Sequence, residues 1–482
     1  MSKENGKKRK RRKSAIAKIR VFLLTFILVI LFGALLLGAW FIIGKNDRGY
    51  EVTSAVIENE EAEYADTKPE DTKPEDAKPF GGVDDLNIGV ADDLNDGGST
   101  GDKRVTSDAA QPVDDETESA DNEAQDESGS NKDLSGAYDD EKKSATVLGE
   151  GINEENRYMV KTASADEVTL AFAGDVQFDP GFAIYNKYKS SGGVDRCISP
   201  GLLNMMRGAD VFMVNNECAI SDRGAPLPEK EYTFREKPSA TQILKDMGVD
   251  IAGVANNHAF DYGEEAFLDT MESLKGANLP LAGAGHDINE AARPVILYAN
   301  DMKIAIITAT QIERYSPPQS RGASESQAGM LRTWPDPTPV LNAIRKAKEE
   351  CDYVILFIHW GTENQVESDW AQNDQLPKFL EAGTDMIIGA HPHILQPVSY
   401  VGDVPVIYSM GNFWFNSKTL DSCLMEVKLS GGELKSLKFV PCQQTGSAVR
   451  LLEGAEAERL LEYMRSISPS VNIDAEGYIT KR

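Results

Sequence analysis

The spacing of hydrophobic residues along this chain changes twice. Residues 21–44 (VFLLTFILVILFGALLLGAWFIIG) are almost continuously apolar and contain no charge, whereas apolar residues are sparse from 46 to 165. From about residue 166 to the end, short apolar runs alternate with segments in which apolar residues recur every three or four positions. These spacings predict a membrane-length helix, a polar segment and a folded domain, in that order.

The folded domain, residues 166–482, is predicted to have an α/β fold. Amphipathic segments at 264–277 and 338–350 have helical spacing and lie between apolar runs of strand length. Near-continuous apolar strands that alternate with helices indicate a sheet covered on both faces. The predicted strands are 168–174, 210–215, 250–256, 303–309, 353–360, 385–390 and 404–410. A hairpin that turns at Gly431 and Gly432 and a helix at 453–467 are predicted to close the domain.

The apolar segment 21–44 is predicted to anchor the chain in a cell membrane. Roughly 20 apolar residues in a helix cross the hydrocarbon core of a bilayer. A basic tail, residues 1–20, precedes the segment and acidic residues follow it, so the positive-inside rule places the N-terminus in the cytoplasm and the rest of the chain outside. The alternative, a cleaved signal peptide, would have a shorter apolar core that ends in small residues, whereas this one ends in AWFIIGK. We therefore expect a single-pass anchor that contacts membrane lipid and is not removed.

Residues 45–165 are predicted to form a disordered acidic linker. The segment is rich in Asp, Glu, Ser, Gly and Asn, and it contains the near-repeat DTKPEDTKPEDAKP at 66–79. A segment of this composition buries too little apolar surface to offset the entropy of ordering it. Repulsion between like charges extends such a chain, so we expect it to hold the folded domain away from the bilayer. The repeat is also open to interpretation as a binding motif.

The charge distribution excludes several classes of protein. The net charge is −27, but residues 1–45 carry eleven basic and one acidic side chain, and residues 46–165 carry eleven basic and thirty-three acidic ones. This asymmetry excludes a soluble cytoplasmic enzyme of uniform composition, and the single spanning segment excludes a polytopic membrane protein. No nucleic-acid partner is expected, because the only basic cluster lies in the first 20 residues.

Polar residues at the ends of the predicted strands give the strongest chemical signal. In open α/β sheets, ligands bind outside the carboxyl ends of the strands, so these residues can converge although about 240 residues separate the first from the last. The strand-end groups are Gly174-Asp175, Asn215-Asn216-Glu217, Asn256-Asn257-His258, His359-Trp360-Gly361, His391-Pro392-His393 and Ser409-Met410-Gly411-Asn412. They include four of the five histidines of the chain.

The residue types in these groups predict a metal site. Imidazole and carboxylate together suit divalent Zn, Mn or Fe, and a carboxylate can bridge two ions about 3.5–4 Å apart, as in enzymes that hydrolyse phosphate esters. Taken alone, each group has a simpler explanation, since Asn257 also suits a helix-starting turn and His359 could be a core residue. The pair His391 and His393 is more specific, because the proline between them stiffens the backbone that holds two imidazoles close together.

Six motifs in a fixed order, GD…NNE…ANNHAFDYG…HWGTE…GAHPH…YSMGNF, span about residues 168–418. In this run the chain resembles the CapA (poly-γ-glutamate capsule synthesis) family, which is related to the calcineurin-like metallophosphoesterases. The resemblance implies a metallophosphatase-like layered α/β sandwich for residues 166–482, outside the cytoplasm and behind a membrane anchor. It also implies a part in the biosynthesis of poly-γ-glutamate capsule or another envelope polymer, with one or two divalent metal ions as cofactors.

The same resemblance implies a set of metal ligands. They are Asp175, Glu217, Asn257, His359, His391 and His393. Glu217 would bridge two sites, with His359 and His391 completing one of them and Asp175 and His393 the other.

Catalytic and substrate-binding residues are also implied at this edge. His258 would act as the acid that protonates a leaving group or would stabilise the transition state, and Asp261 would orient His258. Arg235 is a candidate clamp for a carboxylate or phosphate, since guanidinium binds such groups bidentately. Asn412 and Ser409 are expected to shape the floor of the pocket.

The chain departs from the phosphoesterase pattern at two positions. The first motif is usually Asp-x-His, but here Gln177 stands at the place of the histidine. Glu217 is one methylene longer than the usual aspartate. These departures leave the number of bound metal ions open and would suit a family that has moved to another substrate.

Three interpretations of function follow. The first is a hydrolase or transferase that acts at a phosphate or an amide of a capsule or envelope polymer. The second is a non-catalytic scaffold in a polymer synthesis or export complex, docked to membrane subunits of a polymer synthase. The third is a generic extracellular metallophosphoesterase, which the acidic domain disfavours for highly anionic substrates unless bound metals offset its charge.

Overall fold

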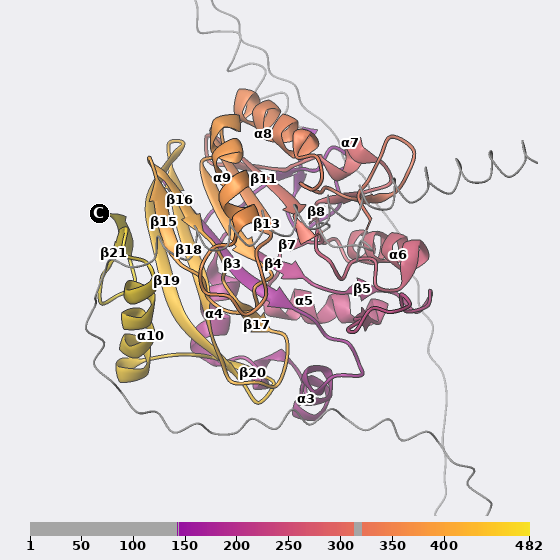
Figure 1. Cartoon of the computed structure of the whole chain (residues 1–482), viewed down its shortest axis with the longest axis horizontal. Helices are drawn as coiled ribbons and strands as arrows, with labels where there is room; N and C mark the ends of the chain where they lie inside the picture. The colour runs from indigo at the N-terminus through magenta and orange to yellow at the C-terminus, as the bar shows by residue number, and fades with distance from the viewer. Residues whose placement is uncertain (1–141, 143, 313–320) are drawn as a thin grey trace, which may run out of the picture. The chain divides into compact units, whose positions relative to one another are not determined.

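The computed structural model describes residues 142, 144–312 and 321–482 (Figure 1). These residues lie within one compact unit, Ser119–Arg482. The predicted tail 1–20, the anchor 21–44 and the linker up to residue 141 fall outside the described residues and stay predictions. Within the described part of the chain, no helix is long and apolar enough to span a membrane.

Two mixed β-sheets form the centre of the domain. The first has the order β1 (Thr146–Val147), β2 (Arg157–Met159), β10 (Val295–Ala299), β11 (Met302–Thr310), β13 (Tyr353–His359), β14 (Met386–Ala390), β16 (Val404–Ile407), β15 (Val398–Val401). The second has the order β20 (Ala448–Leu451), β19 (Glu433–Thr445), β18 (Leu420–Ser430), β3 (Val168–Val176), β4 (Val211–Asn216), β7 (Ile251–Gly253), β8 (Leu281–Ala282), and β17 (Asn412–Trp414) also pairs with β3. Parallel pairing dominates the middle of both sheets, from β11 to β16 and from β3 to β8.

The two sheets are stacked face to face. Leu170 and Phe172 of β3 share one buried hydrophobic cluster with Ile306 of β11 and with Ile355 and Phe357 of β13. The ring centroids of Phe172 and Phe357 are 6.3 Å apart. One face of each sheet is therefore buried against the other sheet.

Helices cover the outer faces of the two sheets (Figure 1). Ala171 and Phe212 on the second sheet pack in a cluster with α3 (Ala183–Ser191), α4 (Pro200–Gly208), α5 (Thr241–Met247) and α6 (Gly263–Gly276). Ile307 and Leu356 on the first sheet pack with α8 (Thr338–Glu350) and α9 (Trp370–Ala382). The α/β class is thus confirmed, but the central strands of each sheet meet helices on one face and the other sheet on the other face. Because the facing sheet and the covering helices both present apolar side chains to a strand, the strands still have nearly continuous apolar sequences.

Smaller elements close the ends of the domain. They are β5 (Ala219–Ile220), β6 (Arg235–Glu236), β9 (Ala284–Gly285), α7 (Ile288–Ala291), β12 (Gly329–Met330), α10 (Gly454–Ile467), β21 (Val471–Ile473), β22 (Ile479–Lys481) and two 3₁₀ turns, Val194–Arg196 and Pro238–Ala240. The predicted hairpin is confirmed: β18 and β19 pair antiparallel and turn at Gly431 and Gly432, where φ is +58° and +75°. Leu460 and Leu461 of α10 complete the inter-sheet core.

Helix α9, like α3, α4, α5 and α7, has no counterpart among the predicted elements. Its start is fixed by a capping box in which Asp369 accepts hydrogen bonds from the backbone N–H groups of Ala371 and Gln372, and the Gln372 side chain accepts from the N–H of Asp369. Pro377 lies inside the helix and interrupts the apolar pattern. Packing of Phe379 under the first sheet stabilises the helix despite that proline.

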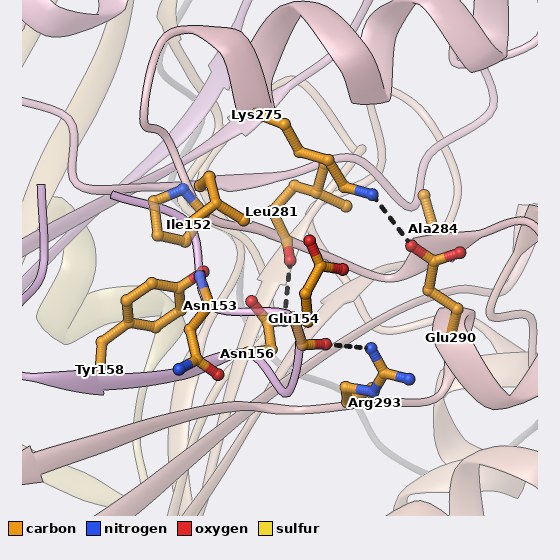
Figure 2. Close-up of a pocket in the computed structure, with 11 residues that line it drawn as sticks. Ile152, Asn153, Glu154, Asn156, Tyr158, Lys275, Leu281, Ala284, Glu290 and Arg293 are labelled. Carbon is orange, nitrogen blue, oxygen red and sulfur yellow. Dashed lines mark hydrogen bonds and ion pairs between the residues drawn. The ribbon is translucent and has the colours of Figure 1, made fainter. Parts of the chain in front are cut away.

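The linker was predicted to end at residue 165, but the folded part begins earlier. β2 pairs with β10, and Tyr158 is fully buried in the inter-sheet core. Figure 2 shows the preceding segment docked on the domain, where the Asn156 side chain donates to the Leu281 carbonyl at 3.1 Å and Arg293 donates to the Glu154 carbonyl at 2.5 Å. The predicted boundary is therefore wrong, because the average composition of the segment hides one buried aromatic and its backbone pairing.

Candidate metal centre

The predicted strand-end residues meet at the carboxyl edge of the two sheets. Asp175 lies near the end of β3, beside Asn215 of β4 and Asn412 of β17 in the strand register. His359 is the last residue of β13, and His391 directly follows β14. The sequence predicted one sheet edge, whereas the site is built by two. The second sheet contributes Asp175, Glu217 and Asn257, and the first contributes His359, His391 and His393.

The potential ligand atoms fall into two groups that share one residue. Glu217, His359 and His391 form one group, and Asp175, Glu217 and His393 form the other. Within each group the facing ligand atoms lie within 4.8 Å of one another. This is the division that the resemblance implied, with Glu217 between the two groups.

Hydrogen-bond geometry shows how closely the first group converges. His359 Nε2 lies 2.8 Å from Asn257 Oδ1, 3.0 Å from His391 Nδ1 and 3.5 Å from Glu217 Oε1. In the second group, His393 Nδ1 lies 3.4 Å from Asp175 Oδ2. In the first group, an amide oxygen, two imidazole nitrogens and a carboxylate oxygen therefore lie close together in one small volume.

The residues present fit a divalent cation. Glu217 is fully buried, and its Oε1 has no hydrogen-bond donor among the described residues. A buried carboxylate oxygen without a partner is costly, and a cation held by imidazoles and carboxylates would remove that cost. Neutral imidazole with carboxylate is the donor set that Zn, Mn and Fe accept.

The pKa shifts of two residues in the first ligand group also support a site for a divalent cation. Burial, and next to it the charge of Asp175, raises the pKa of Glu217 well above its ordinary value. Burial and the neighbouring His391 and His393 lower the pKa of His359 well below its ordinary value. The metal-free centre therefore favours a neutral His359 ring and a protonated Glu217, and a bound cation would deprotonate that carboxyl group.

The His391-Pro392-His393 segment holds two rings in the site by an unusual backbone. His391 has φ of +99° and His393 has φ of +60°, in a region that residues with a side chain rarely adopt. The His391 N–H donates to Asp175 Oδ2 at 3.3 Å, so the turn is tied to the opposite sheet. Such strain at a cluster of potential ligands is typical of functional sites.

His258 lies beside Glu217 and is oriented by Asp261. Its Nδ1 is 2.6 Å from Asp261 Oδ2, and its Nε2 is 3.9 Å from Glu217 Oε1. Burial lowers the pKa of His258 to about 4, although Asp261 opposes the shift. The neutral ring thus offers a lone pair at Nε2, which suits a proton acceptor; the acid role implied by the resemblance requires that the ring first gain a proton.

A pocket of about 400 Å³ opens above the two ligand groups. His258 and His393 form part of its wall, together with Asn412. Its other lining residues are Gln177, Phe182, Tyr232, Phe234, Glu363, Asn364, Phe415, Asn416, Lys418 and Leu420. Of the six predicted ligands only His393 lines the pocket, so the pocket reaches the second ligand group at that residue and has both apolar and polar walls.

Of the predicted substrate-binding residues, only Asn412 lines this pocket. Its Oδ1 lies 2.9 Å from His393 Nδ1, so it also orients that ring. Ser409 is buried and holds the neighbouring loop, donating to the Ile394 carbonyl at 2.8 Å and accepting from the Gly411 N–H at 3.1 Å.

Arg235 is not placed as predicted. Its guanidinium donates to the carbonyls of Arg223 and Gly224 at 3.2 and 3.3 Å and stacks on the Tyr262 ring, 4.2 Å from the centroid. The residues that line the pocket do not include it. The path of the 221–234 loop, which the sequence pattern does not specify, turns this side chain away from the site.

Gln177, which stands where the first motif usually has a histidine, makes structural hydrogen bonds at both ends of its amide. Its Nε2 donates to the Phe415 carbonyl at 2.7 Å, and its Oε1 accepts from the Asp179 N–H at 2.8 Å. The Nε2 end of the amide thus fastens the end of β3 to the segment after β17, and the Oε1 end closes a local turn with Asp179.

Two charged residues near the centre were not among the predicted site residues. Lys230, from the 221–234 loop, contacts Asp261, and Glu363 lines the pocket two positions after Gly361. Glu363 follows the His359 motif directly, so its position beyond the strand end was the available signal. Lys230 has no such signal, because it lies far from any predicted strand end.

A second buried carboxyl group gives a testable pH dependence. Burial raises the pKa of Glu236 to about 7 from an ordinary 4.5. Between these values the folded state binds more protons than the unfolded state, so the free energy of unfolding falls as pH rises and the loss is complete above pH 7. We expect Glu236→Gln to remove this contribution, so that wild type loses up to about 3 kcal/mol more than the variant between pH 4.5 and 8. Urea denaturation of the metal-free proteins measures the free energy of unfolding at each pH. The same pH dependence of that free energy in wild type and Glu236→Gln would contradict the raised pKa of Glu236.

Comparison with known proteins identifies the family. A family model described as bacterial capsule synthesis protein PGA_cap matches residues 169–417. The PGA biosynthesis protein CapA of Bacillus subtilis (strain 168) is 28% identical over 275 residues, which cover 56% of this chain and 70% of the relative. The capsule biosynthesis protein CapA of Bacillus anthracis is 28% identical over 313 residues, covering 62% and 74%.

Among solved structures, a 5'-nucleotidase from Candida albicans SC5314 is 10% identical, with a TM-score of 0.34, and the match covers 58% of this chain and 53% of the other. A likeness at this level supports no conclusion about fold or activity. The family model, in contrast, covers more than half of the 482 residues and includes every predicted ligand. The chain therefore belongs to the PGA_cap family of bacterial capsule synthesis proteins.

Proposed function

We propose that this chain takes part in poly-γ-glutamate capsule biosynthesis as a metal-dependent hydrolase or transferase. The names of its relatives, a PGA biosynthesis protein and a capsule biosynthesis protein, support the biological role. The layered α/β sandwich with its strand-end cluster supports a metallophosphatase-like chemistry.

One observation carries the chemical part of the proposal. Glu217 is shared by two groups of potential ligands, and one of its oxygens is buried without a donor. A bridging carboxylate between two imidazole-containing groups is the arrangement used for displacement reactions at phosphate esters or amides. The pocket above the groups supplies space for a substrate.

When bound, divalent ions would supply a Lewis acid and an activated water molecule. The chain's own residues would do the rest. His258, held by Asp261, would exchange a proton at Nε2 on the pocket side. His393 and Asn412, 2.9 Å apart, would fix the opposite wall of the pocket.

The anchor and the location of the domain belong to the same proposal. The apolar segment 21–44 and the basic tail before it support a single-pass anchor, with residues 166–482 outside the cytoplasm. The acidic linker would give the domain reach to a polymer near the membrane.

A scaffold without catalysis is the second candidate. Gln177 favours it, because an amide whose two ends are hydrogen-bonded replaces a histidine at the first motif. In that case the metal groups would stabilise a domain that docks the membrane subunits of a polymer synthase.

The metal content of the full-length protein tests the proposal. We expect close to two equivalents of a transition metal by elemental analysis, and shortening of γ-linked glutamate polymer by the metal-loaded protein. The polymer chain length should stay constant with His258→Asn, which removes the proton-exchanging ring and leaves the predicted ligands in place. Metal without any change in polymer would favour the scaffold, and a folded protein without metal would overturn the enzyme.

A further inference from the structure

Lys230 is a buried lysine inserted next to the candidate centre. Its side chain is only 6% exposed, although the loop that carries it, residues 221–234, is largely exposed. The backbone just before it is left-handed at Glu229, with φ of +64°. A non-glycine residue in that conformation costs free energy, so tertiary contacts hold the chain in the turn that sends Lys230 inward.

The first partner of Lys230 is the fully buried carboxylate of Asp261. The Lys230 ammonium contacts Asp261 Oδ1, and the opposite oxygen, Oδ2, accepts from the Phe234 N–H at 2.6 Å and faces His258 Nδ1 at 2.6 Å. A buried carboxylate is tolerated only when it is paired and hydrogen-bonded. Lys230 provides the cation that allows Asp261 to remain beside His258.

The second partner of Lys230 is the main chain of a predicted metal ligand. Its ammonium donates to the carbonyl oxygen of Asn257 at 2.6 Å. The side chain of Asn257 points the other way, with Oδ1 2.8 Å from His359 Nε2. The peptide unit that accepts from Lys230 thus joins the ligand Asn257 to the proton-exchanging residue His258.

We propose that Lys230 is a positioning residue, which fixes the Asn257 amide toward the metal groups and the His258 ring toward the pocket by bridging the Asn257 carbonyl and the Asp261 carboxylate. This inference rests on the proposed metal centre for its role in function. Lys230 is not among the residues that line the pocket and is not a predicted ligand; it acts through the two residues it holds. Removal of a residue that orients a metal ligand typically weakens metal affinity by about 10- to 100-fold.

Titration of the full-length protein with Mn²⁺ alone tests the proposal. Lys230→Met keeps the apolar stem and removes the ammonium, and we expect it to weaken Mn²⁺ binding about tenfold or more. Lys230→Arg, which can still donate to both acceptors, should recover most of the affinity. The matched control is Lys275→Met, which breaks a partly buried pair with Glu290 at 3.2 Å (Figure 2). Neither residue belongs to the ligand groups or lines the pocket beside His258, so this variant should leave the affinity for Mn²⁺ unchanged.

A double-mutant cycle in metal-free protein tests the link between Lys230 and His258. We expect His258→Asn to change the equilibrium constant of unfolding by one factor in the wild-type background and by another factor in the Lys230→Met background. The two factors should differ at least fivefold. Additive effects would show that Lys230 and His258 are not coupled through Asp261 and the Asn257 peptide, and would overturn the proposal.

These measurements separate failure of the inference from failure of the proposed function. Wild type that binds no Mn²⁺ would overturn the metal centre, and the cycle would then decide the positioning role alone. Wild-type affinity in Lys230→Met would overturn the positioning role while the metal centre stands. If Lys230→Met does not fold, the double variant Lys230→Met with Asp261→Asn removes both charges of the buried ion pair. Wild-type affinity of this double variant for Mn²⁺ would also overturn the proposal.

Discussion

Glu217→Gln is expected to empty both halves of the candidate metal centre at once. Glutamine keeps the shape of the side chain but removes the one negative charge that the two ligand groups share. Because the ligands must act as a set, we expect affinity for Mn²⁺ or Zn²⁺ to fall by on the order of 100-fold or more, and the metal content of the purified protein to fall below one-tenth of the wild-type value.

The stability of the same variant distinguishes loss of a ligand from loss of the fold. Burial raises the pKa of Glu217, so ionising it in the metal-free protein works against the folded state. Metal-free Glu217→Gln should therefore unfold at a temperature no lower than that of metal-free wild type. Glu433→Gln, at an exposed position on β19, is the matched control and should keep the full metal content. Retention of two equivalents by Glu217→Gln would contradict the shared-carboxylate arrangement.

Gly174→Ala is expected to disrupt the centre through the backbone. A Cβ at Gly174 would lie 1.8 Å from the carbonyl oxygen of Gly411, and neither atom belongs to a flexible side chain. The strand end β17 would have to move away from β3, taking Asn412 with it and breaking the bond in which the Asp175 N–H donates to Gly411 at 3.2 Å. Overpacking of this kind costs about 1–3 kcal/mol and occasionally more, and we expect metal binding to be lost as well.

Gly276→Ala is the matched control for this substitution. Gly276 lies in the last turn of α6, where an added Cβ would meet nothing within 4 Å. Since alanine favours a helix over glycine, this variant should be equal to wild type or more stable by up to about 1 kcal/mol. Equal melting temperatures and equal metal contents for the two variants would show that the close approach at Gly174 is not required.

The two sheets explain why the sequence predicted the convergence of these strand-end residues but not the arrangement of strands that holds them. Asp175, Glu217 and Asn257 follow apolar strands directly, as do His359 and His391, and a strand end is a local feature of the sequence. The division between two stacked sheets depends on which strands pair, and pairing of distant segments leaves no trace in the spacing of residues along one strand.

Loop residues account for the errors around the pocket. Arg235 and Lys230 belong to the same region after β5, and composition alone made the arginine the better candidate for an anion clamp. The fold sends the lysine inward to Asp261 and lays the arginine on Tyr262. The direction of each side chain follows from the left-handed turn at Glu229 and from the surfaces available on either side of the loop.

The sequence by itself determined the α/β alternation, the hairpin at Gly431 and Gly432 and the identity of the strand-end residues that meet at the candidate centre. These features follow from the spacing of apolar residues and from turn chemistry, which act over a few neighbouring positions. Only the tertiary structure decided that β1 and β2 extend the first sheet, that two sheets share the centre, and that Lys230 reaches it. Those outcomes depend on packing between segments far apart in the chain, where the gain from burying a side chain outweighs the local preference of its residue type.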